Sequence, residues 1–403
     1  MKAVFLGLGY IGLPTAAFAA SKGIQVTGVD INPRIVDTIA RGQIHIAEPG
    51  LDELVKRAVN EGYLEVSLTP VEADVYIIVV PTPFKDDMQA DVSFVEAATR
   101  SVISLLKEGD LFIIESTSPV MTTERMMELI FARRPELRNR IYAAYCPERI
   151  LPGNTIHELE HNDRVVGGVN PESTDKACEF YSMFVKGKLH KTDARTAEMC
   201  KLTENSSRDV QIAFANELSM ICDENGIDVA ELINLANKHP RVNILQPGCG
   251  VGGHCIAVDP WFLVSEYPDK AKIIRQAREV NDFKAEWCVS KIFEACVEFE
   301  NRYGRIPALA CMGLAFKPDI DDLRESPAKY IASKVIDRAE GEVMLVEPNI
   351  DTLENHILMP YKEAYAKADI VAWLVKHREF MSMATDDSKI ELDFCGVRKK
   401  TKT

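Results

Sequence analysis

The chain has 403 residues, enough for two or three domains that each bury a core. Its 46% hydrophobic and 27% charged residues are typical of a soluble globular enzyme, and a net charge of −14 argues against nucleic acid as a partner. The apolar runs are of strand length, too short to span a membrane, and the N-terminal stretch leads directly into a folded motif. We therefore expect a cytoplasmic protein without membrane insertion.

The N-terminal part of the chain predicts an α/β fold that begins a doubly wound parallel sheet. Lys2–Gly7 is an apolar strand, Leu13–Lys22 a helix and Ile24–Asp30 a β-branched strand, which together make a βαβ unit. Further strands are expected over 75–80, 111–115 and 141–145, with a helix over 92–107. These later strands end in polar or proline-containing loops, and ligands of such sheets bind at the carboxyl ends of the strands.

A glycine fingerprint, Gly7-Leu-Gly9-Tyr-Ile-Gly12, lies where the first strand meets the first helix. The first glycine permits the turn, the second lets the backbone approach a pyrophosphate, and the third lets the helix pack closely. Asp30 ends the next strand, where it can accept hydrogen bonds from the adenosine ribose and would repel a 2′-phosphate. The cofactor predicted by these residues is NAD rather than NADP.

Helical periodicity dominates the middle of the chain. Ala194–Asp223 predicts one extended helix and Ala271–Phe299 a second, and a glycine-rich loop, Pro247–Asp259, lies between them. Strand patterns return at 306–313, 342–346 and 369–375 without a complete glycine fingerprint. We predict a Rossmann-type domain over residues 1–191, a central long-helix domain over 192–300, and a second Rossmann-like domain over 301–403.

Ten cysteines are scattered along the chain without a Cys-x-x-Cys pair, which indicates free thiols that are mostly buried. Cys255 is a candidate nucleophile because its glycine-rich loop offers few side chains to cover it; the alternative is a structural thiol. Beside a nicotinamide, such a thiol can capture an aldehyde as a thiohemiacetal and permit a second hydride transfer. The spacing of Cys249, His254 and Cys255 fits no zinc pattern, so we expect no metal.

Several polar residues have both a catalytic and an ordinary interpretation. Lys201, Asn205 and Arg208 share one helix face, which suits an acid/base lysine with a positioning amide but also a plain solvated face. Asp259 precedes Pro260, as an ordinary N-cap does. The basic loop residues are either anchors for phosphate or solvated charges: His239, Arg241, Lys317 and Arg324.

Taken together, the chain resembles the UDP-glucose/GDP-mannose dehydrogenase family from end to end. The resemblance is carried by Gly7–Gly12, Cys146–Arg149 followed by Pro152-Gly153, Lys201–Arg208, Gly252–Cys255, and Gly313–Lys317 through Arg324–Pro327. Within the family it is closest to the branch acting on UDP-N-acetylmannosamine. This implies NAD-dependent four-electron oxidation of C6 of UDP-N-acetyl-D-mannosamine to the uronate, for cell-surface polysaccharide biosynthesis. It also implies a UDP-sugar site in residues 301–403 and a homodimer built on the long central helix.

The resemblance assigns roles to individual residues. Cys255 would be the nucleophile, Lys201 the proton donor or acceptor, and Asn205 a holder of the intermediate's oxygen. Asp259 and Glu148 would support proton transfer and water activation. Thr117 would lie near the nicotinamide and the reacting carbon. With Lys201 and Asn205, the sugar nucleotide would contact Arg149, Ile150, Arg208, His239, Arg241, Gly252, Phe316 and Lys317. With the three glycines and Asp30, NAD would contact Tyr10, Ile11, Arg34, Thr82, Thr117 and Arg324.

Two positions depart from the family pattern. Met121 stands where the family commonly has glycine, which bears on the geometry of the loop after Thr117. Cys146-Pro-Glu-Arg149 differs from the Asn-Pro-Glu-Phe of UDP-glucose enzymes, which favours a 2-acetamido sugar. UDP-N-acetylglucosamine and UDP-glucose stay open as substrates. So do a two-electron dehydrogenase of the wider hydroxyacid type and a non-catalytic sensor of NAD or a nucleotide sugar.

Overall fold

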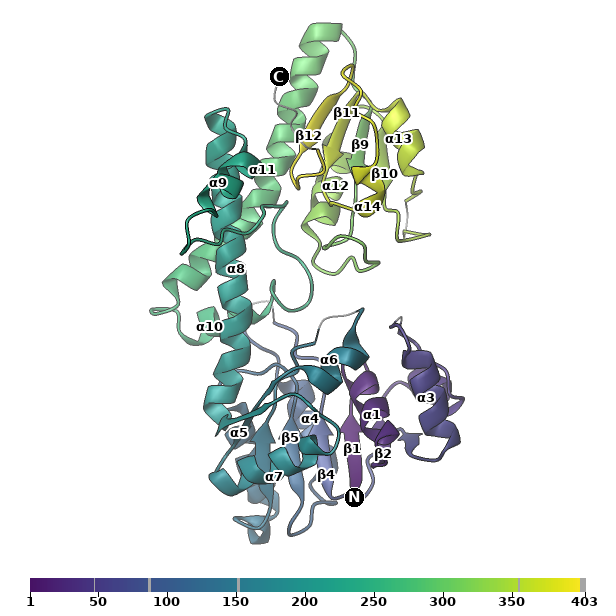
Figure 1. Cartoon of the computed structure of the whole chain (residues 1–403), viewed down its shortest axis with the longest axis vertical. Helices are drawn as coiled ribbons and strands as arrows, with labels where there is room; N and C mark the ends of the chain where they lie inside the picture. Colours follow the sequence, from purple (N-terminus) through teal and green to yellow (C-terminus); the bar gives the residue numbers. More distant parts are fainter. Residues whose placement is uncertain (47, 86–87, 151–152, 354–355, 399–403) are drawn as a thin grey trace. The chain divides into compact units, whose positions relative to one another are not determined.

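The computed structural model describes residues 1–46, 48–85, 88–150, 153–353 and 356–398, so Pro152 lies outside the described residues (Figure 1). The chain forms two compact units, Met1–Thr203 and Glu204–Thr403. The division into three domains therefore stays a prediction. Within the described ranges, no helix combines the length and apolar character that crossing a membrane requires.

The first unit contains an eight-stranded sheet with the order β3-β2-β1-β4-β5-β6-β7-β8. Its strands are β1 (Lys2–Leu6), β2 (Gln25–Val29), β3 (Leu64–Ser67), β4 (Val75–Ile78), β5 (Leu111–Ile114), β6 (Tyr142–Tyr145), β7 (Arg164–Gly168) and β8 (Leu189–Asp193). Neighbouring strands run parallel except β6 and β7, which are antiparallel. This is the doubly wound order of a dinucleotide-binding sheet, with its switch point between β1 and β4. The predicted fold class is confirmed here.

Helices cover both faces of this sheet, and the strands are apolar for that reason (Figure 1). Alternate side chains of β1 enter two cores: Ala3 and Phe5 join one core, and Val4 and Leu6 the other. A strand covered on both faces has no position left for a solvated side chain. The helices are α1 (Gly12–Ser21), α2 (Pro33–Ala40), α3 (Leu51–Asn60), α4 (Ser93–Val102), α5 (Thr122–Arg133), the 3-10 turn η1 (Pro135–Leu137), α6 (Thr155–His161) and α7 (Pro171–Ser182).

The second unit combines long helices with a smaller parallel sheet, as predicted. The helix α8 (Ala194–Glu224) begins in the first unit and is followed by α9 (Val229–Ala236), α10 (Asp259–Glu266) and α11 (Lys272–Tyr303). The sheet has the order β10-β9-β11-β12. Its elements are β9 (Leu309–Met312), α12 (Pro327–Arg338), β10 (Val343–Val346), α13 (Tyr361–Lys367), β11 (Ile370–Trp373), α14 (Arg378–Met381) and β12 (Ile390–Asp393).

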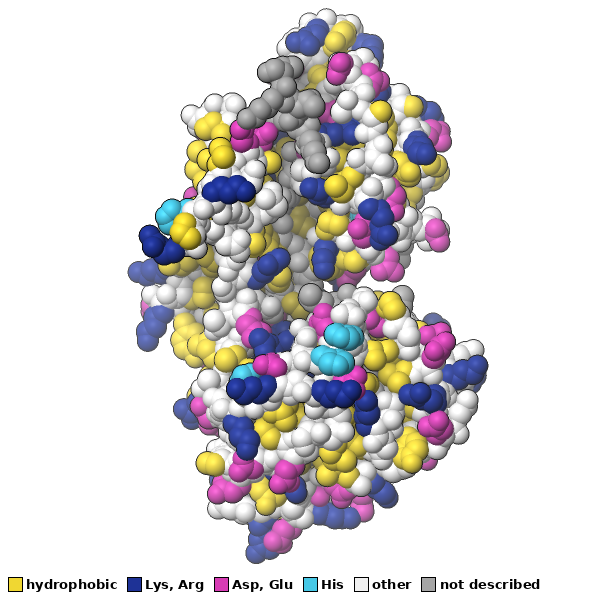
Figure 2. All heavy atoms as spheres, in the orientation of Figure 1, with side chains coloured by type: hydrophobic (Ala, Val, Ile, Leu, Met, Phe, Trp, Pro, Cys, Tyr) yellow, Lys and Arg dark blue, Asp and Glu magenta, His cyan; other side chains and the backbone are white. Residues whose placement is uncertain are grey.

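The second sheet is also buried on both faces. Leu309 and Cys311 of β9 join a core with residues of α11 and α12, whereas Ala310 and Met312 join the core on the other face. Basic and acidic side chains are interspersed over the face of the molecule seen in Figure 2. Although the net charge of the protein is negative, individual basic side chains on its surface can still bind an anion locally.

Candidate active site

The glycine turn between β1 and α1 lies at the switch point of the first sheet. Gly7 has φ 100°, and a Cβ there would lie 2.3 Å from the carbonyl oxygen of Val79. A Cβ on Gly12 would lie 1.9 Å from the carbonyl oxygen of Gly7. Both positions therefore require glycine for the fold itself. A Cβ on Gly9, in contrast, would meet no protein atom within 4 Å. The space in front of Gly9 can thus admit a pyrophosphate at the N-terminus of α1.

The other residues predicted to bind NAD within this unit lie at neighbouring strand ends. Asp30 follows β2, and its carboxylate accepts hydrogen bonds from the backbone N–H groups of Leu8 (3.0 Å) and Asn32 (2.9 Å). These bonds hold the carboxylate beside the glycine turn, where a ribose is expected. Thr82 is buried after β4, and Arg34 is exposed in the first turn of α2. Tyr10 and Ile11 lie in the turn itself, and Tyr10 is exposed.

Gly9→Ala is expected to weaken NAD binding about 10- to 100-fold, a cost of roughly 1.4–2.8 kcal/mol, without lowering the melting temperature. The added methyl group meets no protein atom but takes space that the pyrophosphate needs. Calorimetric titration with NAD measures the affinity. Gly12→Ala serves as the comparison, because its methyl group would collide with Gly7 and should lower the melting temperature. Unchanged affinity in Gly9→Ala would contradict this placement of NAD.

The loop that carries Thr117 ends in a strained residue. Met121 precedes α5 with φ 74°, in the left-handed region that favours glycine. Glu198 of α8 is buried there: one carboxylate oxygen accepts from the backbone N–H of Met121 (2.6 Å). The other oxygen accepts from the backbone N–H (2.8 Å) and the hydroxyl (2.7 Å) of Thr123. Glu198 thus satisfies the first N–H groups of α5 and fixes the loop despite the missing glycine.

Met121→Gly is expected to preserve or raise the melting temperature, whereas Met121→Val should lower it. Glycine removes the strain of the left-handed conformation, and Met121 is 39% exposed, so little buried surface is lost. A β-branched residue tolerates this conformation less well than methionine, by roughly 1–2 kcal/mol. Scanning calorimetry of the three proteins gives the order. A valine variant more stable than the glycine variant would rule out strain at this position.

The loop after β6 brings several predicted residues together within the first unit. The Nζ of Lys201 donates a hydrogen bond to the backbone carbonyl of Glu148 at 2.8 Å. Glu148 is buried, with 8% of the residue exposed. Its carboxylate accepts hydrogen bonds from the backbone N–H groups of Arg149 (2.7 Å) and Ile150 (3.1 Å). It also accepts from the guanidinium of Arg164 at 2.8 Å. Arg164 was not predicted from the sequence, because the strand that it begins, β7, was not recognised.

One turn along α8 from Lys201, Asn205 makes the corresponding contact within the second unit. Its side-chain amide donates to the carboxylate of Asp259 at 2.5 Å. Asp259 is 3% exposed and is the first residue of α10, with Val258 in the N-cap position that the sequence suggested for Asp259. Lys201 and Asn205 are half-buried and hydrogen-bonded, whereas Arg208 is exposed. Burial and hydrogen bonding thus distinguish Lys201 and Asn205 from Arg208, whose side chain is open to solvent.

Cys255 is an exposed thiol on a loop that is fixed at several points. The backbone N–H of Gly253 donates to the carbonyl of Arg324 (3.0 Å), and that of Gly248 to the side chain of Asn216 (2.8 Å). The carbonyl of Cys255 accepts from the backbone N–H of Asp259 at 2.8 Å. Cys249, six residues earlier, is buried in the core of the second unit. Cys249 is thus a buried thiol of the core, whereas the exposure of Cys255 argues against the structural-thiol alternative for that residue.

The environment of the histidine next to the thiol favours its neutral form. Burial lowers the pKa of His254, and the nearby charge of Arg324 lowers it further. Both effects disfavour a positively charged imidazole beside Cys255. Arg324 itself pairs with Asp322 at 2.6 Å and is 52% exposed along its side chain.

The predicted sugar-nucleotide residues of the second unit fall into two groups. Phe316 packs against the Cys255 loop, because a Cβ on Gly252 would lie 2.8 Å from the Phe316 Cβ. Lys317 follows it and is exposed. His239 and Arg241 lie on the exposed turn after α9, where the backbone N–H of Arg241 donates to the His239 ring at 3.4 Å.

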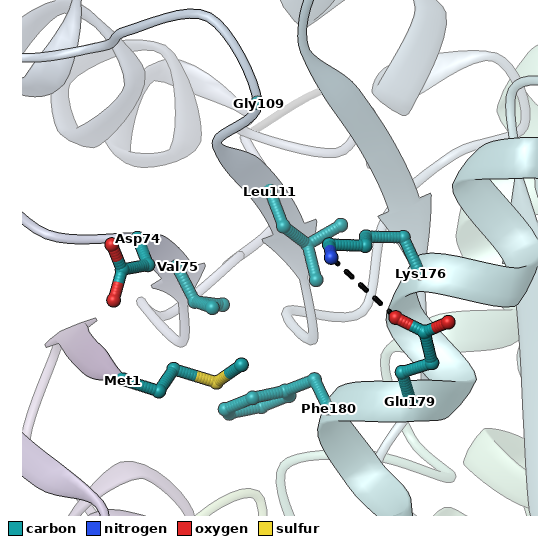
Figure 3. Close-up of a pocket in the computed structure, with 8 residues that line it drawn as sticks. All are labelled: Met1, Asp74, Val75, Gly109, Leu111, Lys176, Glu179 and Phe180. Carbon is teal, nitrogen blue, oxygen red and sulfur yellow. Dashed lines mark hydrogen bonds and ion pairs between the residues drawn. The ribbon is translucent and has the colours of Figure 1, made fainter.

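A pocket of about 230 Å³ lies elsewhere in the first unit (Figure 3). It opens at the amino ends of β1, β4 and β5, opposite the glycine turn, and Lys176 and Glu179 pair beside it at 3.4 Å. Its lining residues are Met1, Asp74, Val75, Gly109, Leu111, Lys176, Glu179 and Phe180. Because ligands of doubly wound sheets bind at the carboxyl ends of the strands, we give this pocket no part in the reaction.

Comparisons with known proteins cover the whole length of the chain. Models of the UDP-glucose/GDP-mannose dehydrogenase family match residues 1–185 (NAD binding domain), 195–283 (central domain) and 310–397 (UDP binding domain). A UDP-N-acetyl-D-mannosamine dehydrogenase of Escherichia coli strain K12 is 53% identical over 95% of this chain and 95% of its own length. An NDP-N-acetyl-D-galactosaminuronic acid dehydrogenase of Ralstonia nicotianae is 51% identical over 97% and 95%. A solved structure of a UDP-D-ManNAc dehydrogenase from Pyrococcus horikoshii aligns with a TM-score of 0.90 at 37% identity, covering 100% of this chain and 97% of that one.

Proposed function

Because the chain belongs to the UDP-glucose/GDP-mannose dehydrogenase family, we propose that it oxidises C6 of UDP-N-acetyl-D-mannosamine to the carboxylate, consuming two NAD and one water. It is an NAD-dependent UDP-sugar dehydrogenase. The names of the E. coli and P. horikoshii relatives support the choice of sugar, as does the Cys146–Arg149 sequence. The exposed thiol of Cys255 carries the four-electron proposal, since a two-electron oxidation has no need of it.

The residues at the glycine turn fit NAD. The open space at Gly9, the N-terminus of α1 and the fixed carboxylate of Asp30 match the pyrophosphate and the ribose. When bound, NAD accepts a hydride from the sugar carbon in each of the two oxidations. Tyr10, Ile11, Arg34, Thr82, Thr117 and Arg324 are proposed to complete its contacts.

The first oxidation needs a group that removes the proton of the C6 hydroxyl. We assign this to Lys201, whose amine is held by the Glu148 carbonyl. The amide of Asn205, held by Asp259, would keep the substrate oxygen in place as it becomes a carbonyl. Arg149, Ile150, Arg208, His239, Arg241, Gly252, Phe316 and Lys317 are proposed to bind the sugar nucleotide, with the basic members facing its phosphates.

The second oxidation passes through Cys255. Its sulfur adds to the aldehyde carbon and forms a thiohemiacetal, and loss of a second hydride leaves a thioester. Water then attacks the thioester carbon, the carbon–sulfur bond breaks, and the acid leaves while Cys255 regains its thiol. Glu148 and Asp259 are proposed to handle the protons of these steps.

The NADH yield over a substrate panel tests this function. The panel holds UDP-N-acetylmannosamine, UDP-N-acetylglucosamine, UDP-glucose and UDP-N-acetylgalactosamine, the last because of the name of the Ralstonia relative. We expect two NADH per UDP-N-acetylmannosamine and the highest kcat/KM with that sugar. A preference for another sugar would refute the substrate and leave the chemistry intact. One NADH per sugar would favour the two-electron alternative, and binding without turnover the sensor.

We also propose a homodimer through α8. Phe214 and Ile221, two turns apart on one face of the helix, are 53% and 50% exposed. Sedimentation equilibrium should give a dimer for the parent and a monomer for Phe214→Glu; a monomeric parent would refute it. A cytoplasmic location and a product that supplies cell-surface polysaccharide complete the proposal. Fractionation of cells and the loss of a surface polysaccharide on gene deletion would test these two points.

A further inference from the structure

A buried cluster of charges lies behind the loop that carries Glu148. Arg164, at the start of β7, is 3% exposed, and Glu115, directly after β5, is 4% exposed. Tyr181 of α7 is fully buried beside them. None of these three residues belongs to the proposed catalytic or binding residues. Burying a guanidinium costs free energy unless hydrogen-bonded anionic partners compensate for the lost water. The contacts of Arg164 therefore indicate its role.

Arg164 and Lys201 hold the Glu148 residue from its two ends. The Nη2 of Arg164 donates to the Glu148 carboxylate at 2.8 Å, and the Lys201 amine donates to the Glu148 carbonyl at 2.8 Å. Backbone N–H groups of Arg149 and Ile150 reach the other carboxylate oxygen. The orientation of the Glu148 carboxylate is thus set by a rigid strand residue and by its own loop.

Glu115 is the second carboxylate near Arg164, but it competes weakly for the guanidinium. Its Oε1 lies 3.9 Å from Arg164 Nη1 and accepts the hydroxyl of Tyr181 at 2.6 Å. Burial is the main cause that raises the pKa of Glu115 to about 7, while the charge of Arg164 lowers it and that of Glu148 raises it. The carboxylate of Glu148, at 2.8 Å against 3.9 Å for Glu115, is therefore the closer partner of the Arg164 guanidinium.

We propose that Arg164 is a positioning residue for thioester hydrolysis, which orients the Glu148 carboxylate to take a proton from the attacking water. In this step the water oxygen bonds to the thioester carbon, the carbon–sulfur bond breaks, and one proton passes through Glu148 to the leaving sulfur. The acid and the free thiol are the products, with no oxidant or reductant consumed. The inference rests on the proposed function, because it requires a thioester at Cys255.

Arg164→Met tests the proposal by separating hydrolysis from oxidation. With UDP-N-acetylmannosamine and NAD, we expect a rapid release of two NADH per active site and then a fall of at least about 100-fold in steady-state kcat. Intact-protein mass spectrometry should show an acyl adduct on Cys255 that accumulates during the stall. Arg164→Lys, which keeps the charge but not the guanidinium geometry, should recover part of kcat and show less adduct.

Two control variants distinguish a positioning role of Arg164 from a general loss of structure on losing an arginine. Arg138→Met removes an arginine that pairs with Glu128 at 2.9 and 2.7 Å but is 52% exposed, and it should turn over as the parent does. In a Glu148→Gln background, Arg164→Met should change kcat by less than about two-fold, because its partner is already lost. That background also removes the buried carboxylate that would otherwise be left unpaired.

Three results would overturn the inference. Arg164→Met could turn over like the parent, it could lose the first release of NADH without any adduct, or its effect could persist in full beside Glu148→Gln. If Arg164→Met does not fold, equal kcat in Arg164→Lys and the parent would overturn it as well. Failure of the proposed function looks different, because the parent itself would then release fewer than two NADH per sugar.

Discussion

Cys255→Ala is expected to abolish formation of the sugar acid, with kcat for acid production at least about 10³-fold lower. Without the sulfur, the aldehyde from the first oxidation has no covalent acceptor and cannot become a thioester. At most one NADH per sugar should then appear, and the aldehyde should be recoverable with a carbonyl-trapping reagent. Stoichiometric NADH counting and mass spectrometry of the sugar product measure both effects.

The control for this variant is a second cysteine that the reaction does not use. Cys395 is half-buried, and its thiol contacts the carbonyl of Trp373, so Cys395→Ala should keep two NADH per sugar. Cys255→Ser retains a weaker nucleophile and should be strongly impaired. A serine variant with full activity, together with one NADH per sugar in the parent, would refute the role of the thiol.

Gly252→Ala is expected to lower kcat at least about 100-fold, although Gly252 carries no reactive group. A Cβ at this position would lie 2.4 Å from the carbonyl oxygen of Glu325 and 2.8 Å from both Phe316 and Pro327. The loop must shift to admit it, and Cys255 lies only three residues further on. A displacement of about 1 Å at a reacting group can cost 10²-fold in rate. Steady-state kinetics and the rate of Cys255 alkylation report the shift.

Gly248→Ala is the matched control within the same loop. A Cβ on Gly248 meets no atom within 4 Å, and the N–H that donates to Asn216 is kept. We therefore expect kcat within about three-fold of the parent. Equal activity in the two variants would show that the contacts of Gly252 do not set the position of the thiol.

The sequence predicted the strands that are buried on both faces. β1, β4, β5, β9 and β11 are continuous apolar runs because helices cover both sides of their sheets. The extended helix α8 was predicted almost to its ends, Ala194–Asp223 against Ala194–Glu224. In these strands and in α8, the hydrophobic pattern of the sequence matches the burial of the residues in the fold. The pattern alone was therefore sufficient to predict the elements.

Four strands escaped prediction: β3, β7, β8 and β12. In β7 and β8 the tertiary context outweighs local propensity. The strand β7 ends in Gly167 and Gly168, where a Cβ would lie 2.2 Å from the Asp193 carbonyl oxygen and 2.3 Å from the Thr174 nitrogen. Glycine is a poor strand former, but here only glycine fits. The strand β8 is an exposed edge strand with polar residues. Missing β7 also meant missing Arg164.

The residues of the candidate site also fall into those that the sequence could predict and those that it could not. The glycine fingerprint and Asp30 are contiguous motifs, and their positions at the carboxyl ends of β1 and β2 followed from the sequence. Lys201 and Asn205 could not be told from a solvated face, because their partners Glu148 and Asp259 lie 53 and 54 residues away along the chain. Contacts of that separation depend on the folded backbone, which helical periodicity does not specify.

The distribution of thiols has a practical consequence for chemical labelling. Of the ten cysteines, Cys255 alone is exposed; the others are buried or half-buried. Burial raises the pKa of Cys146 and of Cys311 to about 12, and that of Cys296 to about 11. Electrophiles react with thiolates, so a maleimide or chloroacetamide should find its main target at Cys255 in the unaltered protein. A fluorophore or a covalent inhibitor could thus be attached at the proposed nucleophile without first removing the other nine cysteines.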